Sequence, residues 1–290
     1  MDIHAYFSRH PLLKQHISYY YFFKTDDPQF SVNYYSFPNL TTPLNIHKNI
    51  DTKISSYTTS IFESKTENSV LLVQGMRKYP LLVNLNGKLD KITIHFKPLG
   101  LNHFIKKPFI EIAQHDSQLF TEWNNEPGYK NFISAFYATN ELENRVNILE
   151  EFLLSVYTPL DIDPIYEKAV SMLTDFTKET SIEQIAKELK TSTRTLDRFF
   201  NKHIGISPVG FKKIARFRHS LDNKLLDQHN KTLTDISYES NFYDQAYFIN
   251  VYKQIAGSNP STFFKTISKL ADDRLVFQFL DTMSEKYNSL

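Results

Sequence analysis

The sequence predicts an α+β protein of two domains, an N-terminal antiparallel β-barrel domain with helices and a C-terminal all-α domain. In the first 100 or so residues, short segments rich in β-branched and aromatic residues alternate with turn signals. From Ile165 to about residue 269, apolar residues recur at helical spacing instead. Pro159 and Pro164 restrict the backbone between these regions, which is typical of a linker. The 290 residues suffice for two domains.

The first region contains five predicted strands. They are the segments ISYYYFF (17–23), SVNYYSF (31–37), KISSYTTSIF (53–62), SVLLVQGM (69–76) and KITIHF (91–96). Asn86-Gly87 lies between two apolar runs, and this dipeptide favours positive φ at both central positions of a tight turn. We therefore expect a hairpin there and an antiparallel barrel or sandwich, cupin-like in outline.

A helix with an apolar stripe is predicted ahead of the linker. Apolar side chains recur at steps of four and three residues over two heptads, at Leu142, Val146, Leu149, Leu153 and Val156. The stripe either packs onto its own domain or forms the seam of a homodimer. Two heptads are too few to decide between these alternatives.

Several classes of protein are disfavoured by composition. The chain has no cysteine, which excludes disulfides, thiolate zinc sites and cysteine nucleophiles. It lacks an apolar run of about 18 residues and a secretory leader pattern, so we expect a cytoplasmic protein. Seven glycines make a glycine-rich phosphate loop improbable, and no catalytic triad is suggested. We therefore expect no enzyme and no cofactor.

Four histidines are candidate metal ligands on a cupin-like barrel: His47, His95, His103 and His115. No His-x-His pair with a following Glu accompanies them. Isolated histidines on strands are more often structural, so we expect no metal site.

The charge is distributed unevenly. The whole chain has a net charge of +1, but residues 181–270 carry 14 Lys and Arg against 8 Asp and Glu. That region therefore has a net charge of +6 and the remainder −5. The asymmetry indicates a basic module that meets a polyanion, joined to an acidic module with another task.

The basic region contains two helix-turn-helix patterns. In the first, Thr180 and Glu183 have capping-box spacing, a short turn follows at 190–191, and Ser192 can cap a second helix. The inward residues of that second helix are Leu196, Phe199 and Phe200, and its outward residues are Arg194, Thr195, Asp197, Arg198 and Lys202. Such a basic outward face is typical of a helix that enters the DNA major groove.

The second pattern repeats this layout. Thr232 and Asp235 have capping-box spacing, Asn241 stands at the turn, and Asp244 can cap the next helix. The predicted inward residues are Phe248, Val251, Tyr252 and Ile255, and the predicted outward residues are Gln245, Ala246, Ile249, Asn250 and Lys253. This outward face has less positive charge than the first, so we expect it to contribute weaker contacts.

A helix of about 19 residues is predicted between the two patterns, with Ser207 as cap and Pro208 in its first turn. It could hold two reading helices in adjacent major grooves. Lys212, Lys213, Arg216 and Arg218 add positive charge suited to phosphates. For Arg216, an ion pair within the domain is at least as favoured.

The basic C-terminal region is similar in sequence to a known protein family. Residues 165–268, with IAKELKTSTRTLDRFFNKHIGISP and the closing pattern FYDQAYF…YK…GxxPxxF, resemble the DNA-binding domain of AraC-family transcription regulators. Lys190 and Asn241 stand where glycines are usual, and Asn259 replaces a usual threonine. The resemblance implies base-edge candidates in both reading helices: Arg194, Asp197, Arg198, Gln245, Ala246, Tyr247, Ile249 and Asn250.

Segments 33–49 and 92–112 more weakly resemble the N-terminal domains of some of these regulators. The expected organisation is a regulatory, ligand-sensing or dimerisation domain (1–158), a DNA-binding domain (165–270) and a tail (271–290). The resemblance implies a sequence-specific regulator, expected to be an activator, with promoter DNA, RNA polymerase and a small-molecule effector as partners. The alternative is a small-molecule-binding or cupin-like enzyme or sensor with an incidental DNA-binding module.

Overall fold

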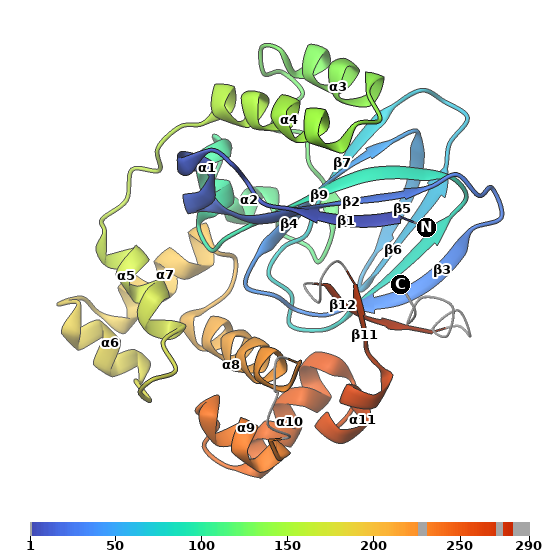
Figure 1. Cartoon of the computed structure of the whole chain (residues 1–290). Coiled ribbons are helices and arrows are strands. Elements are labelled where there is room, and N and C mark those ends of the chain that lie inside the picture. Colours follow the sequence, from blue (N-terminus) through green and yellow to red (C-terminus); the bar gives the residue numbers. More distant parts are fainter. Residues whose placement is uncertain (1, 226–230, 271–274, 281–290) are drawn as a thin grey trace.

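Strands dominate the N-terminal part of the chain and helices the C-terminal part. The computed structural model describes residues 2–225, 231–270 and 275–280. The strands of residues 2–119 form the upper right of Figure 1, and the helices of residues 165–266 lie at the lower left and bottom. The predicted α+β fold with an N-terminal sheet domain and a C-terminal helical domain is confirmed.

Two six-stranded sheets build the N-terminal domain. The first, sheet A, is antiparallel throughout and has the spatial order β1 (Asp2–Tyr6), β2 (Ile17–Thr25), β9 (Leu89–Phe96), β4 (Thr42–Lys48), β7 (Ser69–Val73) and β10 (Gln118–Leu119). The second, sheet B, has the order β11 (Ser268–Leu270), β12 (Leu275–Phe279), β3 (Ser31–Ser36), β8 (Leu81–Asn86), β6 (Thr58–Glu63) and β5 (Ile50–Ser55). Within sheet B, β6 and β8 pair in parallel.

The hairpin predicted at Asn86-Gly87 is wrong. Gly87 has a positive φ of 79°, but β8 and β9 on either side of it belong to different sheets. Each is an inner strand with two partners of its own, so neither has a free edge for the other. The Gly87 amide instead donates to the carbonyl of Phe30, at 2.8 Å. The turn therefore carries the chain from one sheet to the other.

The segment 53–62, predicted as one strand, contributes to two. β5 and β6 pair as an antiparallel hairpin whose turn contains Tyr57, with φ of 61°. A tyrosine at positive φ gives no turn signal in the sequence.

Sheet A is buried on both faces, which explains its long apolar runs. Side chains alternate along each strand, so neighbouring residues face opposite sides. On β9, Ile92, Ile94 and Phe96 pack into the core cluster that includes the covering helices. Lys91 and His95 line a cavity in the space between the two sheets. The interior face of β9 is therefore unusually polar.

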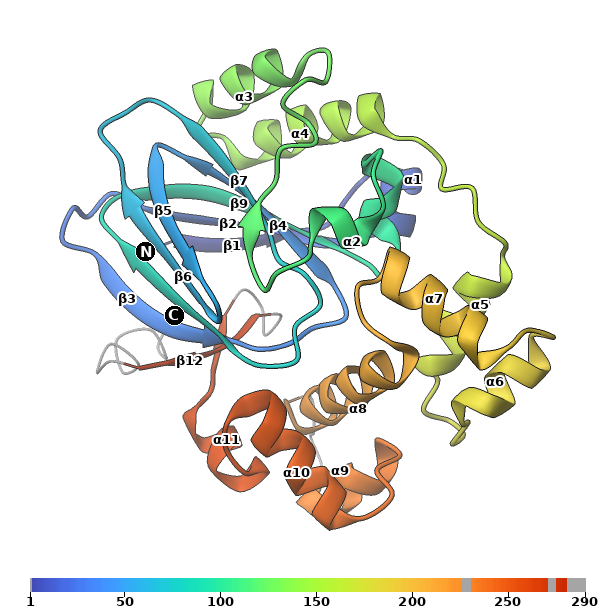
Figure 2. The same ribbon diagram turned by 180° about the vertical axis from the view of Figure 1, so that it is seen from behind.

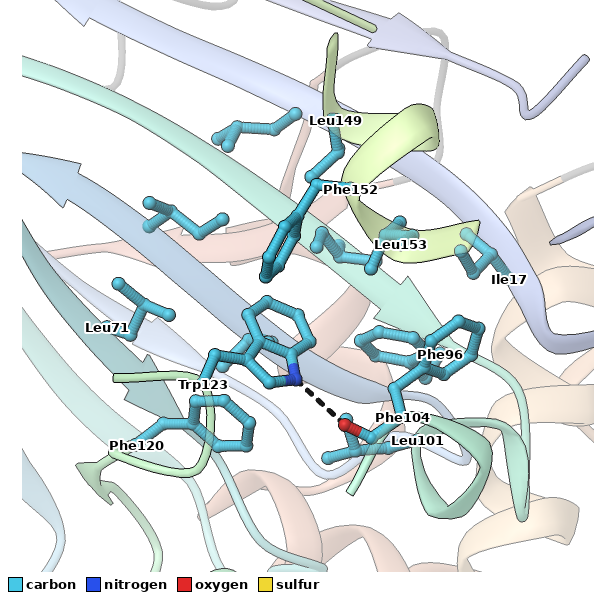
Figure 3. Close-up of a cluster of buried hydrophobic side chains, with 14 of the residues drawn as sticks. Ile17, Leu71, Phe96, Leu101, Phe104, Phe120, Trp123, Leu149, Phe152 and Leu153 are labelled. Atoms are coloured by element: carbon cyan, nitrogen blue, oxygen red, sulfur yellow. Dashed lines mark hydrogen bonds between the residues drawn. The ribbon is translucent and has the colours of Figure 1, made fainter. Parts of the chain in front are cut away.

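Helices cover the outer face of sheet A (Figures 1 and 2). They are α1 (Pro11–His16), the 3-10 helix η1 (Gly100–Phe104), α2 (Phe109–Ile112), α3 (Tyr129–Ala138) and α4 (Leu142–Val156). Trp123 is buried at their centre, and its indole Nε1 donates to the carbonyl of Phe104 at 2.8 Å (Figure 3). In the described part of the chain, no helix combines the length and the apolar character needed to cross a bilayer.

The homodimer seam considered for residues 142–156 is wrong. Val146, Leu149 and Leu153 are buried in the core between α4 and sheet A, and Leu142 and Val156 pack against the same core. Leu149 and Leu153 lie beside the ring of Phe152 in Figure 3. The stripe is used within its own domain because sheet A needs a cover, and it offers no free apolar face to a second subunit.

The chain returns to the N-terminal domain after its last helix. β11 and β12 pair with each other, and β12 adds to the edge of β3, with Phe277 opposite Ser36. The ring of Phe277 lies 4.4 Å from that of Tyr34. Part of the expected tail, 275–279, is thus a strand of sheet B, whereas 271–274 and 281–290 lie outside the described residues.

Arg145 joins α4 to sheet A through a buried ion pair. Its guanidinium donates to both oxygens of Asp90, at 2.7 and 2.9 Å, and to the carbonyl of Thr139. Arg145→Ala should lower the free energy of unfolding by about 3–5 kcal/mol, because it leaves Asp90 partly buried and unpaired.

The matched control is Arg9→Ala, which removes an exposed ion pair with Glu143 and should cost less than about 1 kcal/mol. Denaturant unfolding of both variants tests the difference. Equal losses would contradict the structural role assigned to Arg145.

Candidate DNA interface

The first helix-turn-helix unit consists of α6 (Ile182–Glu188) and α7 (Thr193–His203). Ser181 caps α6 and Gln184 completes the capping box, so the box lies one residue after the predicted Thr180–Glu183 pair. The physical reason is that α6 begins at Ile182, so Ser181 is the extended residue whose hydroxyl reaches the free amide of Gln184. Lys190 takes a positive φ of 53° at the turn, and Ser192 caps α7 as predicted.

The two faces of α7 divide as the sequence predicts. Leu196, Phe199 and Phe200 are buried against the rest of the domain. The opposite face is exposed and carries Arg194, Asp197, Arg198 and Lys202. Asp197 accepts a hydrogen bond from the amide of Asn201 one turn later, at 3.1 Å. One oxygen of the Asp197 carboxylate is therefore already engaged within α7.

The second unit consists of α9 (Leu233–Glu239) and α10 (Gln245–Ala256). The predicted capping box of Thr232 and Asp235 and the predicted cap of α10 at Asp244 are confirmed. The inward residues Phe248, Val251, Tyr252 and Ile255 are buried, and Gln245, Ala246, Ile249 and Asn250 are exposed. Tyr247 is different, because it is partly buried, 5.8 Å from the ring of Phe242 and below the guanidinium of Arg216.

One helix, α8 (Pro208–Leu225), joins the two units. Its 18 residues span about 27 Å at 1.5 Å per residue, close to the separation of adjacent major grooves. Phe211, Ile214, Phe217 and Leu221 on its buried side share one core with side chains of both units. The relative position of α7 and α10 is therefore set by packing on α8.

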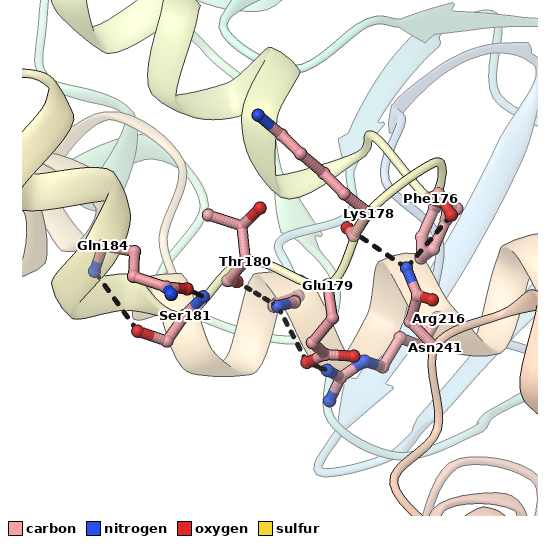
Figure 4. A network of polar contacts seen from close by, with 9 residues as sticks. Phe176, Lys178, Glu179, Thr180, Ser181, Gln184, Arg216 and Asn241 are labelled. Atoms are coloured by element: carbon pink, nitrogen blue, oxygen red, sulfur yellow. Dashed lines mark hydrogen bonds and ion pairs between the residues drawn. The ribbon is translucent and has the colours of Figure 1, made fainter.

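The cations of α8 are engaged within the domain. Glu179 accepts from Lys212 at 3.4 Å and also pairs with Arg216, as Figure 4 shows. Burial and the neighbouring Arg216 lower the pKa of Lys212. Lys213 donates to the side chain of Gln254 at 3.1 Å. The ion pair anticipated for Arg216 is confirmed, and both lysines have partners that a phosphate contact would have to replace.

Asn241 joins the two units at the turn before α10. It takes a positive φ of 54°, at a turn where glycine is usual in the regulators that the sequence resembles. Its side-chain amide donates to the carbonyls of Phe176 and Lys178, at 3.1 and 3.3 Å (Figure 4). These carbonyls lie in the segment leading into α6. Glycine has no side chain to make these contacts. Asparagine at this position therefore links the second unit to the segment that precedes the first.

The helical domain is docked onto the N-terminal domain around the loop between β3 and β4. Arg218 of α8 donates to the carbonyls of Phe37 and Pro38, at 3.0 and 2.7 Å. Arg77 of the N-terminal domain donates to the carbonyls of Ser36 and Phe37. Phe37 itself is buried in the helical core, 4.9 Å from Phe263 of α11 (Pro260–Thr266).

Comparison with protein families adds one decisive finding. The family described as a helix-turn-helix domain matches residues 185–266, which include most of α6 through α11. The C-terminal domain is an AraC-type helix-turn-helix domain. The family assignment and the paired units together make the protein a DNA-binding transcription regulator. Comparison with curated proteins gives no significant match.

Among solved structures, the chain is similar to ToxT from Vibrio cholerae in a 1.65 Å structure, with a TM-score of 0.47 and 14% identity over 85% of this chain and 97% of that one. A structure of ToxT from strain O395 bound to (E)-4-(8-methylnaphthalen-1-yl)but-3-enoic acid gives 0.47 and 13%, over 91% and 99%. Unsaturated fatty acid bound ToxT from strain SCE256 gives 0.43 and 15%, over 90% and 94%.

Sequence reasoning missed the residues that dock the domain. Arg218 was considered only as a source of positive charge, and Phe37 only as the end of a strand. Their partners are backbone carbonyls and apolar atoms about 180 residues away, and such contacts leave no signal in local spacing.

The four histidines considered as metal ligands do not all come together. His47 and His95 line one cavity, whereas His103 accepts a hydrogen bond from the amide of Leu160 and His115 is exposed.

The two turn residues give a matched pair of predictions. Asn241→Ala should lower the free energy of unfolding by about 2–3 kcal/mol, because alanine tolerates the left-handed conformation less well and the two hydrogen bonds are lost. Lys190→Gly should raise the free energy of unfolding by about 0.5–1 kcal/mol, because the exposed Lys190 also takes the left-handed conformation, which glycine adopts without strain.

Denaturant unfolding monitored by circular dichroism measures both effects. A neutral Asn241→Ala variant would show that the ties to Phe176 and Lys178 contribute little.

Proposed function

We propose that the protein is a sequence-specific transcription activator whose two reading helices, α7 and α10, enter adjacent major grooves of promoter DNA. The observation that supports this most directly is the pair of exposed polar faces held by one linker helix in one core. The spacing given by α8 suits grooves one helical turn apart. As an activator the protein would contact RNA polymerase and would act in the cytoplasm, where both partners are found.

The proposed base contacts differ between the units. Arg194 and Arg198 suit guanine O6 and N7, and Gln245 and Asn250 suit adenine N6 and N7. Asp197 is better suited to its own helix, and Tyr247 to a phosphate or to packing, because both side chains already have partners. Ala246 and Ile249 offer apolar contact to a thymine methyl group. Lys202, Lys212 and Lys213 would meet phosphates, the last two after giving up their present partners.

Control of DNA binding is proposed to come from the N-terminal domain, which would sense a small-molecule effector. The docking contacts support this role because they run from the β3–β4 loop to α8. A ligand that shifts the loop would move the helix that carries both units.

Selection from a random DNA library tests the proposal. The protein should enrich a defined sequence and bind it in the nanomolar range, with affinity that falls steeply as salt rises. Recovery of no preferred sequence would falsify sequence-specific regulation.

Two substitutions separate the reading units. Arg198→Ala should weaken binding to the selected site by about 1–3 kcal/mol and reduce the salt slope by about 1 if a phosphate contact is also lost. Asn250→Ala should mainly relax sequence preference and leave the salt slope unchanged. Lys53→Ala on β5, exposed in the other domain, serves as the control. Fluorescence anisotropy on matched and scrambled sites measures all three, and an equal loss on every sequence for Asn250→Ala would refute its assignment to base reading.

A further inference from the structure

The space between the two sheets contains a row of polar side chains. On the interior face of sheet A, Lys91 of β9 stands opposite His47 of β4, and Thr93 stands opposite Asn45. Lys91, His47 and Asn45 line a cavity of about 40 Å³ whose wall also includes aromatic and aliphatic side chains, among them Tyr21, Leu72, Val83 and Phe277. Polar groups placed inside an apolar layer are costly unless they have partners.

Lys91 is the centre of this row. It is only 3% exposed. Its ammonium donates to the hydroxyl of Tyr21 at 3.2 Å and lies 5.2 Å from the centre of the same ring. The structure records no carboxylate in ion-pair contact with it among the described residues, since its sequence neighbour Asp90 pairs with Arg145. The cavity therefore contains a buried positive charge without a counter-ion.

Hydrogen-bonding groups without partners gather at the same cavity. Both ring nitrogens of His47 are fully buried and unpaired, and so are the hydroxyls of Thr59 and Ser117. All three residues line the cavity with Lys91. Burial and the charge of Lys91 hold the pKa of His47 well below its usual value, so the ring is neutral and presents one donor and one acceptor.

The other polar side chains of the row have hydrogen-bond partners, so the unpaired groups are confined to the end around Lys91. Thr93 donates to Asn45 at 2.7 Å, Asn45 donates to the carbonyl of Leu72, and His95 bonds to Thr41 at 2.9 Å. Only the end around Lys91 combines a spare positive charge with spare donors. A cation is disfavoured there by Lys91, and an anion supplies what is lacking.

We propose that Lys91, His47, Thr59 and Ser117 form an interior binding site for a small, singly charged carboxylate. The cavity has room for about three water molecules, which suits a carboxylate group and a short chain. One ammonium and a few neutral donors match a single negative charge. A phosphate dianion is better held by guanidinium forks and backbone amides than by this set.

The site deepens the proposed function, because it supplies the effector class on which control of the DNA-binding domain would rest. Ser36 lines the cavity, and its carbonyl and hydroxyl both accept from Arg77. Arg77 shares the carbonyl of Phe37 with Arg218 of α8. An occupant therefore lies one residue away from the contacts that dock the helical domain.

Thermal melting of the full chain in acetate, propionate or chloride at equal ionic strength tests the site. Wild-type protein should melt about 2 °C or more higher in a carboxylate than in chloride. Lys91→Met should abolish that difference. Without added carboxylate it should melt at the same temperature as wild type or higher, because an apolar side chain of similar length replaces an uncompensated charge.

The matched control is Lys53→Met, which removes an exposed ammonium lying 5.8 Å from the ring centre of Phe62 and should keep the carboxylate response. A response that survives in Lys91→Met overturns the site. Equal stabilisation by chloride and carboxylate overturns the carboxylate assignment. A Lys91→Met variant that melts lower in chloride assigns Lys91 a purely structural role and also overturns the proposal.

DNA binding separates this site from the proposed function. A Lys91-dependent carboxylate response in a protein without DNA sequence preference supports the site and rejects the regulator. Sequence-specific binding in a protein without a carboxylate response does the reverse.

Discussion

The arrangement of the molecule depends on two arginines that converge on one loop. Arg77 from the sandwich and Arg218 from α8 donate to consecutive carbonyls at residues 36–38. Carbonyl groups carry only partial charge, and the two guanidinium groups repel each other. Burial and the neighbouring Arg218 accordingly lower the pKa of Arg77 to about 10, although Asp116 opposes the shift. The loop carbonyls accept from both cations, and Asp116 near Arg77 and Asp222 near Arg218 offset part of the repulsion.

The consequence extends to the DNA interface. α8 is fixed by the loop at Arg218 and by Glu179 at Lys212 and Arg216. α7 and α10 both pack on α8, so their orientation follows the position of this single element. The tie from Asn241 to the segment before α6 adds a direct link between the units. A disturbance at the β3–β4 loop would thus move both faces together rather than one alone.

Local patterns in the sequence predicted the helical domain well. The caps at Ser192, Thr232 and Asp244 and the inward residues of α7 and α10 follow from helical spacing and side-chain chemistry close in sequence. The sandwich was harder, because strand pairing is non-local. Asn86-Gly87 gave a strong hairpin signal, yet the strands on either side already had partners in different sheets. Tyr57 made a turn without any turn signal, and β4 carries polar residues that obscured it.

The interior polar row was present in the sequence as the alternation of Lys91, Thr93 and His95 with Ile92, Ile94 and Phe96. Alternation of this kind normally indicates one face in water. Here both faces are covered, one by α4 and its neighbours and the other by sheet B. Only the layer structure reveals that the polar face points inward, and that feature distinguishes a candidate site from an ordinary exposed strand.

The return of the chain to sheet B after α11 alters how the helical domain can move. It is joined to the sandwich by one covalent connection ahead of α5 (Ile165–Leu173) and by a second through β11 and β12. A body tethered at one point can swing in any direction, whereas a body tethered at two points turns chiefly about the line between them. The second tether also covers the edge of β3, which would otherwise present unpaired backbone groups to other chains. The helical domain is in this sense an insertion between strands of the sandwich, and it can rotate chiefly about a single axis.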